Sequence, residues 1–172
     1  MLKAAIIMGS DSDLEVMSAA AGVFSHFSVP FEIKILSAHR TTAAALAFAA
    51  AAERKGFGVI VAGAGGAAHL PGVLAAATAL PVIGVPVNAT SLNGLDALLS
   101  IVQMPAGIPV AAVGVNGAKN AGLLAVQLLA LRERSLRTKL KIYREKMKKE
   151  VLAKSARLEK LGYKKYLEEM KK

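Results

Sequence analysis

AAIIMGSDSD, residues 4–13, joins a short apolar run to a turn of small and acidic residues, and a helix-like pattern follows to about Phe27. An apolar run without alternation is typical of a strand buried on both faces. The same order of strand, loop and helix recurs along the body of the chain. It predicts further strands at 31–36, 59–62, 81–87 and 109–115, and further helices at 43–55, 70–78, 94–102 and 118–131. Thr41 or Thr42 can cap the helix that begins at 43.

Five buried strands that alternate with helices predict an α/β fold, a three-layer flavodoxin-like doubly wound parallel sheet of order 2-1-3-4-5 in residues 1–131. In that order a crevice opens outside the carboxyl ends of strands 1 and 3. The loops that leave these strands are 9–13 and 63–69, and strand 2 ends beside them in 37–40. We therefore expect these three loops to meet at one site.

The charge is concentrated in the C-terminal segment. Residues 1–131 carry six Lys or Arg against six Asp or Glu, whereas residues 132–172 carry sixteen against six. The charges alternate with Leu, Ile, Val and Tyr at helical spacing, which indicates one or two amphipathic helices with a break at Gly162. We expect a C-terminal helical extension, part of the same domain or packed on a neighbouring subunit. A solvated helical face explains the positive charge of this segment better than a nucleic-acid site does. Strongly salt-dependent binding of nucleic acid would support the alternative of a nucleic-acid binder.

Composition removes several classes of function. The absence of cysteine excludes a disulfide framework, a thiolate nucleophile and a cysteine-ligated metal. The nearly apolar stretch 70–87 contains prolines and glycines and is expected to be a helix and a buried strand, with no membrane association. The first apolar run is too short for a secretory signal, so a cytoplasmic protein is expected. A hydrophobic content of 54% with only 5% aromatic residues predicts surface buried between subunits, as in a homo-oligomer.

The loop GSDSD, residues 9–13, ends a strand and opens a helix. Its backbone N–H groups and serine hydroxyls could form an anion site. The carboxylates of Asp11 and Asp13 suit ribose hydroxyls better than a phosphate. The alternative is an ordinary helix cap made by Ser10 or Asp11.

The loop SAHR, residues 37–40, offers a hydroxyl, an imidazole and a guanidinium at a strand end. Arg40 suits bidentate binding of phosphate. His39 is the candidate acid and base, because imidazole exchanges protons near neutral pH. The alternative is a surface loop of unrelated polar residues.

The loop GAGGAA, residues 63–68, matches the G-x-G-x-x-A dinucleotide pattern only weakly. It follows the third strand, and no acidic residue lies about twenty positions later. Its glycines more plausibly let the backbone approach a flat ligand closely. His69 can be either a helix N-terminal residue bonded to backbone or a ligand contact, and His26 is expected to be structural or exposed. Three scattered histidines without paired ligand spacing predict no metal site.

Several motifs together resemble the catalytic-subunit family of phosphoribosylaminoimidazole carboxylase, and within it the bacterial N5-carboxyaminoimidazole ribonucleotide mutase class. They are MGSDSD (8–13), SAHRT (37–41), AGAGGAAHLPG (62–72), PVIGVPV (81–87), SIVQMP (100–105) with GIPVA (107–111), and AKNAGLLA (118–125). They occur in the right order and span nearly the whole body.

The resemblance implies conversion of N5-carboxyaminoimidazole ribonucleotide to 4-carboxy-5-aminoimidazole ribonucleotide in purine (IMP) biosynthesis, without ATP, metal or organic cofactor. The carbamate would lose CO2, and ring carbon C4 would recapture it. His39 would shuttle the proton. Ser10, Ser12, Asp13, Ser37 and Arg40 would hold the phosphate and ribose, and Gly63, Ala64, Gly65, Gly66, His69 and Leu70 would enclose the base and trap CO2. The resemblance also implies a homo-octamer, and a transient hand-off from the ATP-dependent enzyme that forms the carbamate is conceivable.

Other functions remain open at this point. A direct carboxylase would use CO2 and the aminoimidazole ribonucleotide, although Arg40 and the AGAGGAAHLPG motif resemble the mutases. A non-enzymatic nucleotide-binding module would have no need of a titrating group at His39. Two departures from the mutase pattern are Thr42, where proline is usual, and Ala106, where glycine is common.

Overall fold

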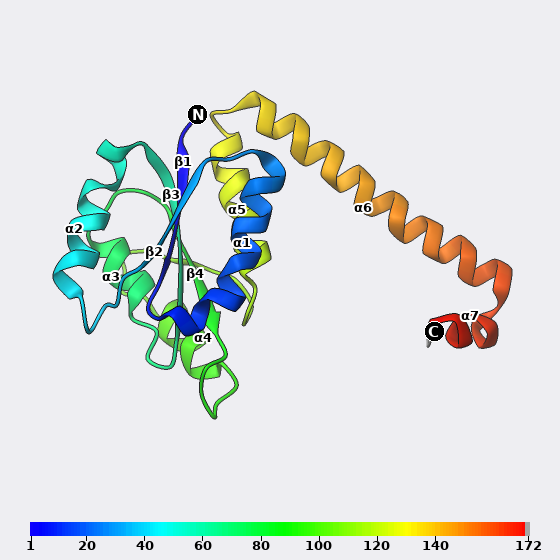
Figure 1. Ribbon diagram of the computed structural model, residues 1–172, viewed down its shortest axis with the longest axis horizontal. Coiled ribbons are helices and arrows are strands. Elements are labelled where there is room, and N and C mark those ends of the chain that lie inside the picture. The colour runs from blue at the N-terminus through cyan, green and yellow to red at the C-terminus, as the bar shows by residue number, and fades with distance from the viewer. Residues whose placement is uncertain (171–172) are drawn as a thin grey trace.

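Five parallel strands form one sheet in the order β2-β1-β3-β4-β5, in a computed structural model that describes residues 1–170 (Figure 1). The strands are β1 (Lys3–Met8), β2 (Phe31–Ile35), β3 (Phe57–Gly65), β4 (Val82–Val87) and β5 (Ala111–Ala112). The helices are α1 (Leu14–Phe27), α2 (Thr42–Ala52), α3 (Leu70–Ala76), α4 (Leu95–Val102), α5 (Ala118–Ala130), α6 (Arg134–Leu161) and α7 (Tyr163–Met170). Two 3-10 turns, η1 (Asp11–Asp13) and η2 (Glu53–Lys55), adjoin α1 and α2. The predicted fold class and strand order are confirmed.

Two apolar cores lie on the two faces of the sheet. Helices α1 and α5 cover one face, where Phe24 and Val126 pack against strand residues such as Val61. Helices α2, α3 and α4 cover the other face, where Phe48 and Leu74 belong to the core. The many alanines and glycines allow close helix packing.

The prediction of five buried strands is wrong at both edges of the sheet. The strands β1, β3 and β4 are buried, but Ile33 and Ile35 of β2 are 41% and 55% exposed, and both residues of β5 are exposed. An edge strand has a neighbour on one side only, which leaves its backbone and side chains partly uncovered. The expected strand 109–115 shrinks to two residues, and Pro109 at its start has no N–H to donate to a ladder.

The C-terminal extension leaves the body as the long helix α6 and folds back at its far end as α7 (Figure 1). Gly162 separates the two helices with a φ of 71°, which confirms the predicted break. Only the root of α6 packs on the body, through buried Leu136 and Leu140 and through Lys139 Nζ, which donates to Phe27 O at 2.8 Å. Tyr143 also packs on the body, and beyond it Met147, Val151, Leu152 and Leu158 are exposed.

The apolar stretch 70–87 is divided between α3 and β4, as expected. Within residues 1–170, no helix combines the length and the apolar character that a membrane crossing requires.

Candidate active site

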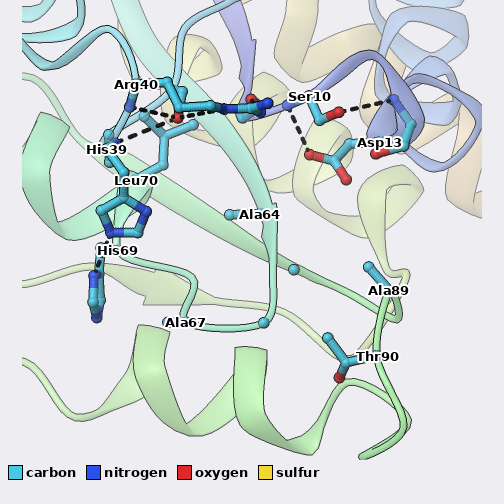
Figure 2. Close-up of a pocket in the computed structure, with 16 residues that line it drawn as sticks. Ser10, Asp13, His39, Arg40, Ala64, Ala67, His69, Leu70, Ala89 and Thr90 are labelled. Carbon is cyan, nitrogen blue, oxygen red and sulfur yellow. Dashed lines mark hydrogen bonds between the residues drawn. The ribbon is translucent and has the colours of Figure 1, made fainter.

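The loops that follow β1, β2, β3 and β4 surround one cavity of about 380 Å³ at the carboxyl ends of the strands (Figure 2). The expected meeting of the first three loops is therefore confirmed. Of the residues predicted for the site, the cavity is lined by Ser10, Ser12, Asp13, Ser37, His39, Arg40, Ala64, Gly65, Gly66, His69 and Leu70. A cavity of this volume is in the range of small-molecule sites.

The first loop caps the helical turn that follows it and also lines the cavity, so the helix-cap alternative is confirmed, whereas anion binding by this loop stays a prediction. Ser10 N–H donates to Asp13 Oδ2 at 3.2 Å, and Ser12 N–H donates to Asp11 Oδ1 at 3.1 Å. These N–H groups already donate to carboxylates, so an anion could bind to them only if it displaced the carboxylates.

Asp13 is the one acidic side chain buried in the cavity wall, with 4% of its surface exposed. Burial raises the pKa of this carboxyl group, because a charged form is penalised away from water. The N–H groups of Ser10 and Gly9, the Ser12 side chain and the charge of Arg40 act in the opposite direction.

We expect Asp13→Asn to stabilise the protein more at neutral pH than at acidic pH. A raised pKa in the folded state means that stability is fully present below the ordinary pKa of aspartate, about 3.9, and is lost as pH rises through the raised value. The amide does not titrate, so the difference in free energy of unfolding, variant minus wild type, should grow from about pH 3 to pH 7. Urea titrations at both pH values measure it. A difference that shrinks with pH would show that the hydrogen bonds and Arg40 outweigh burial.

The second loop is held by the side chain of Ser37. Its Oγ accepts from the N–H of His39 at 3.3 Å and from the N–H of Arg40 at 3.1 Å. Arg40 Nη2 donates to Gly9 O at 2.9 Å and ties this loop to the first one. Thr41 occupies the N-cap position of α2 without a side-chain capping bond, and its Oγ1 instead accepts from Ser37 N–H at 2.8 Å.

The third loop brings His69 against His39. The distance from His39 Nε2 to His69 Nδ1 is 2.8 Å, and the rings meet nearly at right angles, at 85° (Figure 2). At this distance the two nitrogens can share a hydrogen bond, in which the tautomer decides which ring donates and which accepts. The sequence left the role of His69 open, and a pairing across thirty positions has no local signal. His26 lies elsewhere, against Phe27 and Tyr143.

Gly63 does not line the cavity. It lies within β3, which is longer than predicted and ends at Gly65. A Cβ at Gly63 would overlap the Met17 side chain, and one at Gly65 would lie 2.6 Å from Ala89 Cβ. The G-x-G-x-x-A pattern thus begins inside a strand, whereas a dinucleotide fingerprint places its glycines in the turn between strand and helix.

Ala89 and Thr90, in the loop after β4, also line the cavity. No sequence signal marked these two residues, because neither side chain titrates and because loop 88–94 follows a strand that was not expected at the crevice. Across residues 1–170, histidines and carboxylates do not gather in threes or more where a metal ion could bind.

Comparison with known proteins identifies the family. The model of the AIR carboxylase family matches residues 3–150. The chain is 60% identical to an N5-carboxyaminoimidazole ribonucleotide mutase of Pyrococcus abyssi, over 98% of this chain and 97% of that protein. It is 56% identical to the Thermotoga maritima protein of the same name, over 97% of this chain and 98% of that protein.

A longer relative and a solved structure are also similar to this chain. The chain is 56% identical to the phosphoribosylaminoimidazole carboxylase of Saccharomyces cerevisiae over 95% of its own length, but it covers 28% of that protein. The crystal structure of Treponema denticola PurE is similar with a TM-score of 0.77 and 26% identity, over 90% of this chain and 97% of that one. The family model covers most of the chain and the mutase relatives match it almost from end to end, so the chain belongs to the AIR carboxylase family.

Proposed function

We propose that this chain is a mutase that converts N5-carboxyaminoimidazole ribonucleotide to 4-carboxy-5-aminoimidazole ribonucleotide in purine biosynthesis. The observation that carries the proposal is the pair of imidazoles, His39 and His69, in one cavity with a guanidinium and three serine hydroxyls. The names of the full-length relatives support the same reaction.

In the proposed mechanism His39 is the single acid and base. The carbamate C–N bond breaks, CO2 leaves, and protonated His39 gives its proton to the exocyclic nitrogen. Ring carbon C4 then attacks CO2, and the now neutral His39 removes the proton from C4. The first step leaves His39 as the base that the second step requires, so protons balance over one turnover. His69 is the natural partner to hold the His39 ring in place.

The remaining residues are assigned to binding. Arg40, Ser37 and Ser10 also line a second hollow of about 360 Å³ beside the cavity, and we assign the phosphate to their shared border. Asp13 and Ser12 are assigned to the ribose. The segment Ala64–Gly66, with Leu70 and His69, is assigned to the base and to CO2, and Gly63 supports this wall from within β3. The reaction requires no cofactor or metal.

Conversion of the carbamate by purified protein, in EDTA-treated buffer without ATP, tests the proposal. We expect the C4 carboxylate to form from N5-carboxyaminoimidazole ribonucleotide. Formation only from the aminoimidazole ribonucleotide and CO2 would favour the direct carboxylase instead. Tight binding of ribonucleotide without any turnover would favour a binding module. We also propose that the activity is cytoplasmic, with a transient hand-off of the labile substrate from the ATP-dependent enzyme that forms the carbamate.

We further propose a homo-oligomer larger than a dimer, for which the resemblance implies eight subunits. Two apolar surfaces lack a partner within residues 1–170. One is the far part of α6, and the other is formed by Leu92, Leu95, Leu99 and Val102 along and before α4, which are 46–60% exposed. Patches of this kind mark interfaces.

Light scattering should therefore give a mass well above twice the 17.8 kDa of one chain. Val151→Glu should reduce the mass, because it places a charge on the apolar surface of α6. Lys146→Glu, which lies five residues from Val151 and therefore on another side of the same helix, is the control for charge alone and should not reduce the mass. A mass of 17.8 kDa for the wild type would contradict the proposal.

A further inference from the structure

The loop 88–94 closes the cavity on the side opposite the two histidines. Figure 2 shows Ala89 and Thr90 across the cavity from His39 and His69. Ala89 Cβ packs so closely on β3 that only glycine fits at Gly65. The Thr90 methyl faces Gly66, where a Cβ would lie 3.6 Å from Thr90 Cγ2. Two methyl groups, from Ala89 and Thr90, thus form an apolar wall, which we call the loop wall.

The loop wall is tied down at two points. Asn88 N–H donates to Asn116 Oδ1 at 2.9 Å, and Thr90 Oγ1 donates to Asp96 Oδ2 at 2.6 Å. Asp96 lies in the first turn of α4, whose Ala97 and Ile101 are buried in the core. The second tie therefore connects the wall to a rigid element.

The hydroxyl of Thr90 can donate one hydrogen bond, and the carboxylate of Asp96 accepts it. With the oxygen held by Asp96, the methyl group is held toward Gly66. We propose that Asp96 is a positioning residue that acts through Thr90: it fixes the methyl side of the loop wall toward the cavity and keeps the loop closed during the reaction.

The charge state of Asp96 supports this arrangement. The hydrogen bond from Thr90 lowers the pKa of the Asp96 carboxyl group, so the acceptor is a carboxylate at working pH. Hydrogen bonds to a charged acceptor are roughly twice as strong as those between neutral groups. The backbone N–H groups of Ala97 and Asp96 also lower this pKa, and Thr90 is the side chain within residues 1–170 that donates a hydrogen bond to the carboxylate.

The consequence for the reaction rests on the proposed function. Between the two steps CO2 is free in the cavity, with no covalent or ionic tie. A closed apolar wall retains it beside C4, whereas an open wall lets CO2 leave. The chain would then release the aminoimidazole ribonucleotide and CO2 in place of the C4 carboxylate. The Thr90–Asp96 bond should therefore control the fraction of turnovers that leak.

Two substitutions at one position separate the bond from the packing. Thr90→Val keeps the branched shape and removes the hydroxyl, and Thr90→Ser keeps the hydroxyl and removes the methyl. We expect Thr90→Val to raise the ratio of released aminoimidazole ribonucleotide to C4 carboxylate by at least about tenfold, the equivalent of one charge-assisted hydrogen bond. Thr90→Ser should raise it less. Asp96→Ala should match Thr90→Val, and the double variant should be no worse than either.

Amide hydrogen exchange in loop 88–94 is the readout independent of activity. It should become faster in Thr90→Val and Asp96→Ala and should stay near the wild-type rate in Thr90→Ser. Equal leakage in Thr90→Val and wild type, equal exchange rates, or additive effects in the double variant would overturn the inference. If the wild type makes no C4 carboxylate, the proposed function fails, and the exchange rates alone decide whether the tie exists.

Discussion

Replacement of His39 by asparagine is expected to lower turnover of N5-carboxyaminoimidazole ribonucleotide by at least about a hundredfold. Asparagine retains a polar side chain of similar reach but cannot carry the proton from one step to the next. Ribonucleotide binding should stay within a few-fold of wild type, because Arg40, Ser37 and Ser10 remain in place. Single-turnover kinetics and calorimetric titration with the aminoimidazole ribonucleotide measure the two effects separately.

His69→Asn is the matched control, since it keeps His39 and removes only its 2.8 Å partner. It should reduce turnover less than His39→Asn, because the ring that exchanges the proton survives. If His39→Asn turns over normally while His69→Asn does not, the roles of the two histidines are reversed. If His39→Asn loses binding as strongly as turnover, then His39 is a binding residue.

In contrast to His39→Asn, Arg40→Ala is expected to affect binding more than turnover. It should weaken ribonucleotide binding by about ten- to a hundredfold. A hydrogen bond to a charged group contributes about 1.5–3 kcal/mol, which corresponds to that range. The side chain also ties the second loop to Gly9 O, so its loss loosens both loops at the border of the two hollows. Calorimetric titration measures the affinity, and single-turnover rates at saturating substrate should fall less.

Arg40→Lys provides the graded comparison. It keeps the positive charge but not the planar fork that can bind Gly9 O and a phosphate together, so its affinity should lie between alanine and wild type. The phosphate origin of the effect is tested with the dephosphorylated nucleoside. Its affinity should be nearly equal in wild type and Arg40→Ala, and an equal loss with nucleoside and nucleotide would place the phosphate elsewhere.

The order of the sheet could be read from the sequence because the signals are local. Apolar runs such as 4–8 and 81–87 alternate with helix patterns, and right-handed crossovers leave few arrangements of parallel strands. Edge positions were readable only in part. Glu32 and Lys34 alternate with apolar residues, which is typical of a strand exposed on one face, but the exposure of Ile33 and Ile35 follows from the position of β2 at the edge, with β1 as its one neighbouring strand. The ends of β3 and β5 likewise depend on which neighbouring strand offers partners.

The sequence by itself determined the fold class and the three loops that carry polar groups. It also marked His39 and Arg40 as candidates for moving a proton and for holding an anion, because these suggestions follow from residue type and local spacing. The bonds between the carboxylates and the N–H groups of the first loop are local, and they agree with the helix cap that the sequence offered there. Only the tertiary structure decided that His69 meets His39 and that Thr90 is held by Asp96. The first contact joins side chains from loops that the parallel strands bring together, and the second is one hydrogen bond that sets the orientation of a loop side chain. Their geometry depends on strand register and loop closure, which no local pattern encodes.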